Sequence, residues 1–253
     1  MDARPIGVFD SGMGGISVLR ELRAHLPREH YIFYGDNANA PYGVRTEDEI
    51  QELCWTVVRK LLDFDIKALV IGCNTATAAA VKSFRAELDI PILGIEPAIK
   101  PAALSAPGKR VLVLATGATL RLEKFQALKA IYCPDAICVP SPELVMFVER
   151  GVFSGPELDD YLERLLAPYK DENIGSVVLG CTHFIFLRRA IARHLPGIPA
   201  FDGNGGIANH LAHVLSERDL LSPAAEGKIE FYTSGDPERY IPVMKRLLEL
   251  NEL

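Results

Sequence analysis

The sequence predicts an α/β fold with mostly parallel strands, arranged as two pseudo-symmetric lobes that each hold a sheet flanked by helices. Short apolar runs alternate with helical patterns from one end of the 253-residue chain to the other, which is typical of strand–helix–strand units. One local sequence occurs twice, around Cys73 and around Cys181. Apolar residues make up 49% of the chain, so a sizeable core is available.

Nine apolar runs have the length and the β-branched content of buried strands. They lie at Ile6–Phe9, Tyr31–Tyr34, Ala68–Ile71, Ile92–Gly94, Arg110–Ala115, Ala136–Val139, Ser176–Leu179, Pro199–Phe201 and Ile229–Thr233.

Helical patterns fill the segments between these runs. Residues 50–62 carry apolar side chains at helical spacing, and Thr46 with Glu49 forms a capping box before them. Cys54 lies on this apolar stripe, so we expect it in the core. Residues 158–166 form a second stripe of the same kind.

An internal repeat divides the pattern into two halves. Residues 69–75, Leu-Val-Ile-Gly-Cys-Asn-Thr, are echoed by residues 177–183, Val-Val-Leu-Gly-Cys-Thr-His. Residues 8–12 precede the first of these segments, and residues 112–117 precede the second at a similar spacing along the chain. The repeat predicts two similar lobes with a cleft between them.

The lobe boundaries follow from the repeat alone, because no linker rich in Gly, Pro or Ser divides the chain. We expect the first lobe to comprise residues 1–95 plus a returning segment, 208–253. Residues 96–207 then form the second lobe.

Charge and cysteine content exclude several classes of protein. A net charge of -6 and a pI near 5.6 argue against a nucleic-acid or anionic-membrane surface, although helix ends still allow a small anionic substrate. Five cysteines, an odd number, do not indicate a disulfide framework. Residues 1–7 lack a signal-peptide pattern and the longest apolar stretch, residues 68–81, is interrupted. We therefore expect a cytoplasmic location and no membrane contact.

Cys73 and Cys181 each end an apolar run and open a polar stretch that leads into a predicted helix. Parallel sheets bind ligands at the carboxyl ends of their strands, where both thiols are expected. The helix N-termini at residues 74–75 and 182–183 should lower the pKa of both thiols. Free cysteine is often a small buried core residue, but the matched polar settings favour one acid and one base facing each other across a pocket.

Three further positions are candidates for the same pocket. Asp10 follows the first predicted strand, where it either caps a helix or holds a substrate ammonium and polarises a neighbouring thiol. Tyr42 and Gly43 either present a hydroxyl and a backbone N–H to a carboxylate or form a surface turn. His183, beside Cys181, acts as a base or proton relay or makes a structural hydrogen bond.

No cofactor is expected. The glycine spacing in residues 10–15 matches neither the dinucleotide fingerprint nor a phosphate loop. Cys133 and Cys138 lack a second ligand pair at zinc spacing, so we expect no metal site. No lysine stands in a setting that indicates a pyridoxal Schiff base.

The sequence resembles the glutamate racemases of the Asp/Glu racemase family. The matching segments occur in family order over residues 6 to about 206. They are Phe9-Asp10-Ser11-Gly12 with Gly14-Gly15, Tyr34-Gly35-Asp36 with Pro41-Tyr42-Gly43, Gly72-Cys73-Asn74-Thr75-Ala76, Gly94-Ile95-Glu96-Pro97, and Leu179-Gly180-Cys181-Thr182-His183.

The resemblance implies an active site in the cleft between the lobes and a cofactor-independent isomerase that racemises glutamate. Cys73 and Cys181 are then the two proton donors and acceptors, tuned by Asp10 and His183. The implied substrate-binding residues are Asp10, Ser11, Tyr42, Gly43, Asn74, Thr75, Thr116, Thr119, Thr182 and His183. The implied role is to supply D-glutamate for peptidoglycan, and thus for cell wall biogenesis and cell shape. The implied partner is glutamate, and a homodimer stays open.

The sequence departs from the family pattern at three places. Phe184-Ile185-Phe186 stands where the family commonly has Tyr-Pro-Leu, and Asp202-Gly203-Asn204 replaces a common Asp-Ser-Gly. The threonine loop at residues 115–119 has a shifted order. These changes leave both thiols in place and affect pocket polarity and lobe packing.

Two-base chemistry accounts for the residue types. Inversion at Cα needs a base on one face and an acid on the other, and two thiols from opposite lobes supply both. Without a Schiff base, the carbanion must be stabilised by helix N-termini and backbone donors.

Three alternatives remain open from the residues. An aspartate racemase is disfavoured by His183 after Cys-Thr, and a one-cysteine decarboxylase by the second cysteine. A two-lobed solute-binding or regulatory module without catalysis would, in its secreted form, need a signal peptide.

Overall fold

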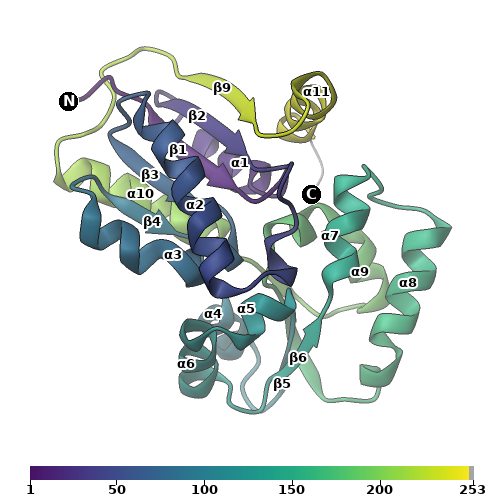
Figure 1. The fold of residues 1–253 in the computed structure, drawn as a ribbon. Helices are drawn as coiled ribbons and strands as arrows, with labels where there is room; N and C mark the ends of the chain where they lie inside the picture. The colour runs from purple at the N-terminus through teal and green to yellow at the C-terminus, as the bar shows by residue number, and fades with distance from the viewer. Residues whose placement is uncertain (251–253) are drawn as a thin grey trace.

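Two all-parallel sheets form the frame of the computed structural model, which describes residues 1–250. The first sheet has the strand order β4-β3-β1-β2-β9 and the second has the order β6-β5-β7-β8. Figure 1 shows the two sheets as separate lobes, with helices on the faces of each. The predicted α/β class with two lobes is confirmed.

Every apolar run predicted as a strand is one, with bounds that differ by at most two residues at either end. The first sheet contains β1 (Ile6–Asp10), β2 (His30–Gly35), β3 (Ala68–Ile71), β4 (Ile92–Gly94) and β9 (Lys228–Thr233). The second contains β5 (Arg110–Ala115), β6 (Ile137–Pro140), β7 (Ile174–Leu179) and β8 (Ala200–Phe201).

Strand pairing repeats from one lobe to the other. The parallel pairs β1–β2, β1–β3 and β3–β4 recur as β5–β6, β5–β7 and β7–β8. This topology confirms the internal repeat seen in the sequence. β9 has no counterpart in the repeat and pairs with β2, so the chain returns to the first lobe. The exact division at residues 95/96 and 207/208 stays a prediction.

Helices cover both faces of each sheet. Around the first sheet lie α1 (Ile16–His25), α2 (Glu47–Leu62), α3 (Asn74–Glu87), α10 (Asn204–Glu217) and α11 (Pro237–Leu248). The second lobe contains α4 (Ile99–Ser105), α5 (Gly117–Arg121), α6 (Glu123–Tyr132), α7 (Pro142–Glu149), α8 (Pro156–Leu166) and α9 (Arg188–His194). Three short 3-10 helices are η1 (Tyr42–Val44), η2 (Ala167–Tyr169) and η3 (Thr182–Leu187). Within residues 1–250 no helix has the length and apolarity needed to cross a membrane.

The predicted capping box starts α2. The Thr46 hydroxyl accepts a hydrogen bond from the backbone N–H of Glu49, and the Glu49 carboxylate accepts one from the backbone N–H of Thr46. These bonds satisfy N–H groups that a helix start leaves free. Cys54 of this helix is buried in the core, as predicted.

Alternate side chains of the first sheet enter two different cores. Val8 and Val70 join a cluster with α1, α10 and α11 that continues into the second lobe. Phe9 and Ile71 join a cluster with α2 and α3. The first cluster therefore packs the lobes together on the α1 side, while polar residues meet at the carboxyl ends of the strands.

A buried ion pair fastens distant segments to the start of the first sheet. The side chain of Lys67 is fully buried, and its Nζ lies 2.6 Å from Oε2 of Glu29. Nζ also donates to the backbone carbonyls of Asp2 and Leu220, both at 2.7 Å. Oε1 of Glu29 accepts from the backbone N–H of Ser222 at 2.8 Å. The pair thus joins the N-terminal segment, the start of β2 and the connection from α10 to β9.

Replacing this lysine by methionine (Lys67→Met) should lower the free energy of unfolding by about 3–5 kcal/mol, because the Glu29 carboxylate would stay buried without its charge partner. Urea denaturation at pH 7 measures the loss. The control Lys170→Met removes an exposed pair with Glu163 and should change stability far less. Equal losses in the two variants would contradict this role of Lys67.

Candidate active site

Polar residues gather where the strands of both sheets end. β1 and β3 are neighbours in the first sheet, as β5 and β7 are in the second. Asp10 ends β1 and Cys73 follows β3, while Thr116 follows β5 and Cys181 follows β7. The carboxyl ends of parallel strands are the usual ligand-binding edge of such sheets. We call the region where these two edges meet the seam.

The helix α3 begins at Asn74, as predicted, and Cys73 is its N-cap residue. Its Sγ accepts from the backbone N–H of Ala76 at 3.4 Å and lies 3.3 Å from the hydroxyl of Ser11. Burial, together with the negative charges of Asp10 and Cys181, raises the pKa of the Cys73 thiol to about 12. The two hydrogen bonds lower this pKa, but by less than burial raises it. The lowered pKa expected from the sequence is therefore wrong for Cys73 in this closed state, because desolvation outweighs the helix N-terminus.

Cys181 lies in a different local structure. The segment after it is the 3-10 helix η3 rather than the predicted α-helix, and the Cys181 side chain makes no cap hydrogen bond within the described chain. All six side chains of η3 are buried. They include Phe184-Ile185-Phe186, the segment that differs from the common family pattern. The expected α-helix begins only at Arg188, where α9 follows η3 directly. Sγ of Cys181 instead lies 3.6 Å from Nδ1 of His183.

His183 connects this thiol to a carboxylate. Its Nε2 lies 2.7 Å from Oε1 of Glu149. Burial opposes a charge on the ring, but the contacts with Cys181 and Glu149 outweigh it and raise the pKa of His183 well above its usual range. The sulfur and the carboxylate therefore favour the protonated imidazole, in which both ring nitrogens donate: Nδ1 to the sulfur and Nε2 to the carboxylate.

Glu149 is a site residue that the sequence analysis missed. It ends α7, where its Oε1 also accepts from the backbone N–H of Met13 at 2.8 Å and its Oε2 accepts from Nδ2 of Asn37 at 3.4 Å. Burial raises the pKa of Glu149, but the hydrogen bonds from His183, Met13 and Asn37 lower it overall. One signal was available, because an acidic residue in the last turn of a helix opposes the helix dipole.

Asp10 is buried and faces the second lobe. It accepts from the backbone N–H of Gly12 at 2.8 Å and from the hydroxyl of Thr182 at 3.0 Å. Burial raises its pKa, against the His183 charge and these two hydrogen bonds. Its side chain does not cap α1, whose N-cap is Gly15 within the described residues, so the helix-cap alternative is wrong.

The loop after Asp10 requires glycine at position 14. A Cβ there would lie 2.4 Å from Nδ1 of His183 and 2.5 Å from the hydroxyl oxygen of Thr182. These distances are shorter than any side chain permits. The glycine-rich loop thus lets the backbone of the first lobe approach η3 of the second.

Three threonine hydroxyls close the seam at another point. Thr75 of the first lobe lies 3.0 Å from Thr116 and 3.0 Å from Thr119 of the second, which are 2.9 Å apart. All three side chains are buried. The predicted threonines therefore meet as one cluster of donors and acceptors.

The Tyr42 hydroxyl is directed into the protein. It donates to Oδ2 of Asp36 at 2.5 Å, and the same carboxylate accepts from Nδ2 of Asn39. In this state Tyr42 therefore binds Asp36, and its role toward a ligand stays a prediction. At Gly43, a Cβ would lie 2.8 Å from Cβ of Thr116, so the two lobes touch here as well.

Asn74 carries an unused hydrogen-bonding group at the seam. Its Oδ1 is buried and has no partner within residues 1–250. Buried polar atoms in proteins are rarely left unpaired. This oxygen is therefore available to a donor on a ligand, such as an ammonium group.

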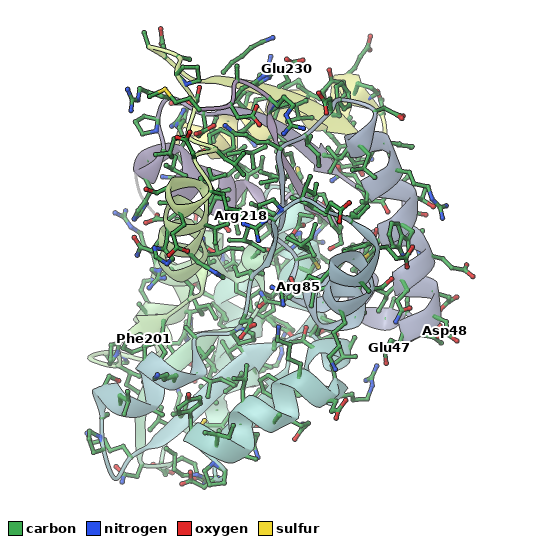
Figure 2. The ribbon with its side chains drawn as sticks, turned by 90° about the vertical axis from the view of Figure 1, so that its left-hand side faces the viewer. Glu47, Asp48, Arg85, Phe201, Arg218 and Glu230 are labelled. Atoms are coloured by element: carbon green, nitrogen blue, oxygen red, sulfur yellow. The ribbon has the colours of Figure 1, made fainter. Side chains whose placement is uncertain are left out.

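The lobes are closed over these residues. Both thiols are buried, and neither lines any of five hollows on the surface of the described chain. A hollow of about 600 Å³ lies between the η1–α2 and α5–α6 segments, beside the seam. Figure 2 marks its edge with Glu47 at the start of α2.

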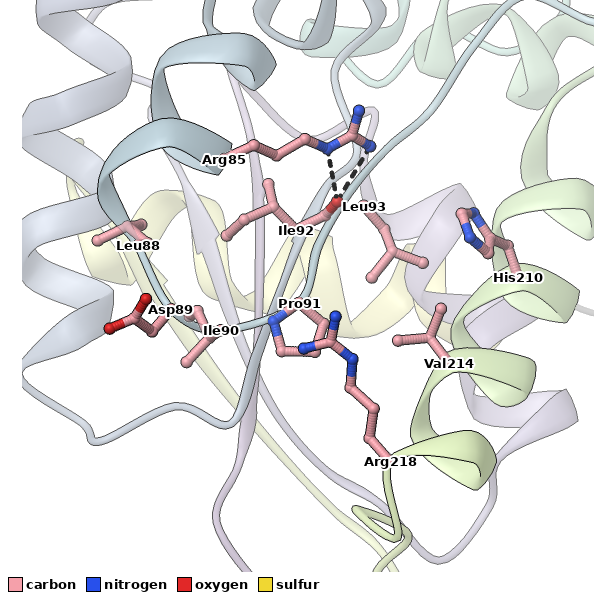
Figure 3. A pocket seen from close by; sticks show the side chains of 10 residues that line it. All are labelled: Arg85, Leu88, Asp89, Ile90, Pro91, Ile92, Leu93, His210, Val214 and Arg218. Carbon is pink, nitrogen blue, oxygen red and sulfur yellow. Dashed lines mark hydrogen bonds between the residues drawn. The ribbon is translucent and has the colours of Figure 1, made fainter.

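A second hollow lies away from the seam. It is an open groove of about 340 Å³ between α3, β4 and α10, shown in Figure 3. Arg85 donates to the backbone carbonyl of Ile92 beside it. Arg218 and His210 border the groove from α10. None of the predicted site residues lines this groove.

The groups at the candidate site that can exchange protons are side chains of the protein itself. No group of three or more His, Cys, Asp or Glu residues within positions 1–250 is arranged to hold a metal ion. The two thiols come from opposite lobes, as predicted, because Cys73 follows β3 of the first sheet and Cys181 follows β7 of the second. One thiol is paired with a charged imidazole, and the other is held in its protonated form.

Comparison with protein families gives one match over most of the chain. Residues 10–211 match the model of the Asp/Glu/hydantoin racemase family. The chain is 41% identical over 251 residues to a glutamate racemase of Clostridium botulinum, covering 97% of each protein.

Solved structures of glutamate racemases share the fold. The structure from Escherichia coli, in complex with L-glutamate and the activator UDP-MurNAc-ala, is 33% identical with a TM-score of 0.86, covering 96% of this chain and 95% of that one. The structure from Francisella tularensis in complex with D-glutamate is 29% identical with a TM-score of 0.85, covering 100% and 97%.

Replacing the carboxylate by an amide (Glu149→Gln) should lower the pKa of His183, because it removes the charge that favours the imidazolium. Nitrogen-15 NMR of histidine-labelled protein follows this titration. In the native protein the raised pKa adds stability below a pH of about 6.5 and loses it as the pH rises through the folded-state pKa.

The matched control is Glu143→Gln on the same helix, whose carboxylate accepts from the Tyr161 hydroxyl. It should leave the His183 titration unchanged. An unchanged titration in the Glu149 variant would contradict the charge assignment.

Proposed function

This chain belongs to the Asp/Glu/hydantoin racemase family, and we propose that it interconverts L-glutamate and D-glutamate. The observation that carries the proposal is the pair of buried thiols, Cys73 and Cys181, which reach one seam from opposite lobes. The near-full-length similarity to glutamate racemases supports glutamate as the substrate.

The reaction inverts Cα by two proton transfers. A thiolate on one face removes the Cα proton and becomes a thiol, while the thiol on the other face gives its proton to the carbanion and becomes a thiolate. The product leaves inverted and the two sulfurs have exchanged protonation states. One thiolate of the chain accepts the Cα proton and the other thiol supplies its replacement, so the reaction as proposed uses no cofactor.

The surroundings of the thiols assign their starting roles. The charged His183 donates to the Cys181 sulfur, and a thiolate accepts such a bond better than a thiol does, so Cys181 starts as the base. Cys73 starts as the acid, because burial keeps its pKa at about 12. Asp10 lies beside Cys73, and its negative charge favours the protonated form of that thiol.

Glutamate binds by replacing contacts that the closed seam makes with itself. We assign one substrate carboxylate to the hydroxyls of Thr75, Thr116 and Thr119, which otherwise bond one another. We assign the ammonium to the unpaired Oδ1 of Asn74 and the acidic side of Asp10. Ser11, Thr182, Tyr42 and Gly43 complete the proposed set of substrate-binding residues.

The lobes must part to admit glutamate and close again around it. The bonds from Thr182 to Asp10, from Met13 to Glu149 and among the threonines hold the closed form. Closure removes water, which strengthens every electrostatic interaction with the developing carbanion.

The cellular role follows from the product. D-glutamate made by this isomerase supplies peptidoglycan synthesis, and so serves cell wall biogenesis and cell shape. The cytoplasmic location expected from the sequence stays a prediction, and a homodimer stays open.

Incubation with L-glutamate in deuterium oxide tests the function directly. The native protein should form D-glutamate that carries deuterium at Cα. Cys73→Ala and Cys181→Ala should each lower racemisation by at least roughly a hundredfold, the scale of lost acid–base catalysis. Chiral chromatography with mass spectrometry measures both products.

The control Cys138→Ala changes a half-exposed thiol outside the seam and should leave the rate unchanged. Racemisation retained in either alanine variant of the paired thiols would overturn the two-thiol mechanism. Equal deuterium incorporation into aspartate would overturn the assignment of the substrate.

A further inference from the structure

The contacts of Glu149 continue into the last strand of the first lobe. Asn37 follows β2, and its Nδ2 donates to Oε2 of Glu149 at 3.4 Å. Oδ1 of the same amide accepts from the hydroxyl of Thr233 at 2.8 Å. Thr233 is the last residue of β9. A chain of hydrogen bonds therefore runs from β9 through Asn37 and Glu149 to His183.

The donor and the acceptor of each hydrogen bond in this series can be assigned. Oε2 of Glu149 is an acceptor in the ionised carboxylate, so the Asn37 amide must face it with its NH₂ group. The amide oxygen is then left for Thr233. The Thr233 hydroxyl already accepts from the backbone N–H of Gly235 at 3.0 Å, which leaves its proton free to point at Asn37.

The two oxygens of Glu149 have separate tasks. Oε1 meets both Nε2 of His183 and the backbone N–H of Met13. Oε2 is held by Asn37. Without that bond the carboxylate can rotate about its last torsion, and the orientation of the His183 ring beside the Cys181 sulfur is no longer fixed.

These contacts cross the seam. Asn37 and Met13 belong to the first lobe, while Glu149 and His183 belong to the second. Glu149 therefore has its complete set of donors only when the lobes are closed. The orientation of His183 is coupled to closure through Asn37.

We propose that Asn37 is a positioning residue for proton transfer at Cys181, and that Thr233 fixes the orientation of its amide. The proposal rests on the proposed racemisation. Asn37 acts through Glu149 and His183, and it contacts neither thiol. Its loss should therefore affect the chemical step rather than the binding of substrate.

The variant Asn37→Ala should lower kcat roughly tenfold, the effect of one hydrogen bond to a charged group, and leave KM nearly unchanged. Because the bond from Asn37 lowers the pKa of Glu149, the acidic limb of the kcat–pH profile should move to higher pH. Thr233→Val should shift both quantities in the same direction, and Thr233→Ser, which keeps the hydroxyl, should restore native values.

A nitrogen-15 spectrum of His183 serves as a readout that does not depend on turnover. Asn37→Ala should change the Nε2 resonance, while Thr233→Ser should not. If the native protein does not racemise glutamate, the proposed function fails and this spectrum still decides the positioning role. Native kcat, pH limb and Nε2 resonance in Asn37→Ala, or equal impairment in Thr233→Ser and Thr233→Val, would overturn the proposal.

Discussion

The hydrogen bond between Glu149 and His183 is the interaction on which the rest of the site depends. A histidine buried among apolar side chains would ordinarily lose its charge, because desolvation disfavours the ionised ring. The contacts with Cys181 and Glu149 together reverse that outcome, and the pKa of His183 rises instead. The charged ring then places a donor against the sulfur of Cys181. The same carboxylate also binds the first lobe, so one residue combines charge control with closure.

The two lobes have the same strand pairing but give the two thiols different surroundings. Cys73 and Cys181 follow equivalent strands, β3 and β7. Cys73 caps a full α-helix and neighbours Asp10, whereas Cys181 precedes a buried 3-10 helix and neighbours His183. Equivalent positions put the sulfurs on opposite sides of one seam. Different neighbours let one start as acid and the other as base, which is what inversion at Cα requires.

The placement of the two sulfurs at one seam depends on a close approach of the lobes. Gly14 and Gly43 lie where a Cβ would collide with the opposite lobe, so glycine at these positions allows the backbone of one lobe to approach the other closely. As a consequence, a bound substrate must replace the hydrogen bonds among Thr75, Thr116 and Thr119. These three hydroxyls satisfy one another in the closed seam, so a substrate carboxylate must offer them equivalent partners.

The sequence by itself determined the frame and the two thiols. Strand runs, the capping box before α2 and the repeat around Cys73 and Cys181 are local patterns, because periodicity and side-chain caps act over a few residues. Glu149, Asn37 and the inward turn of the Tyr42 hydroxyl appeared only in the tertiary structure. Their partners lie far away along the chain, and the pKa of Cys73 depends on what covers it. Contacts between distant segments and desolvation are properties of the folded molecule, and no local pattern encodes them.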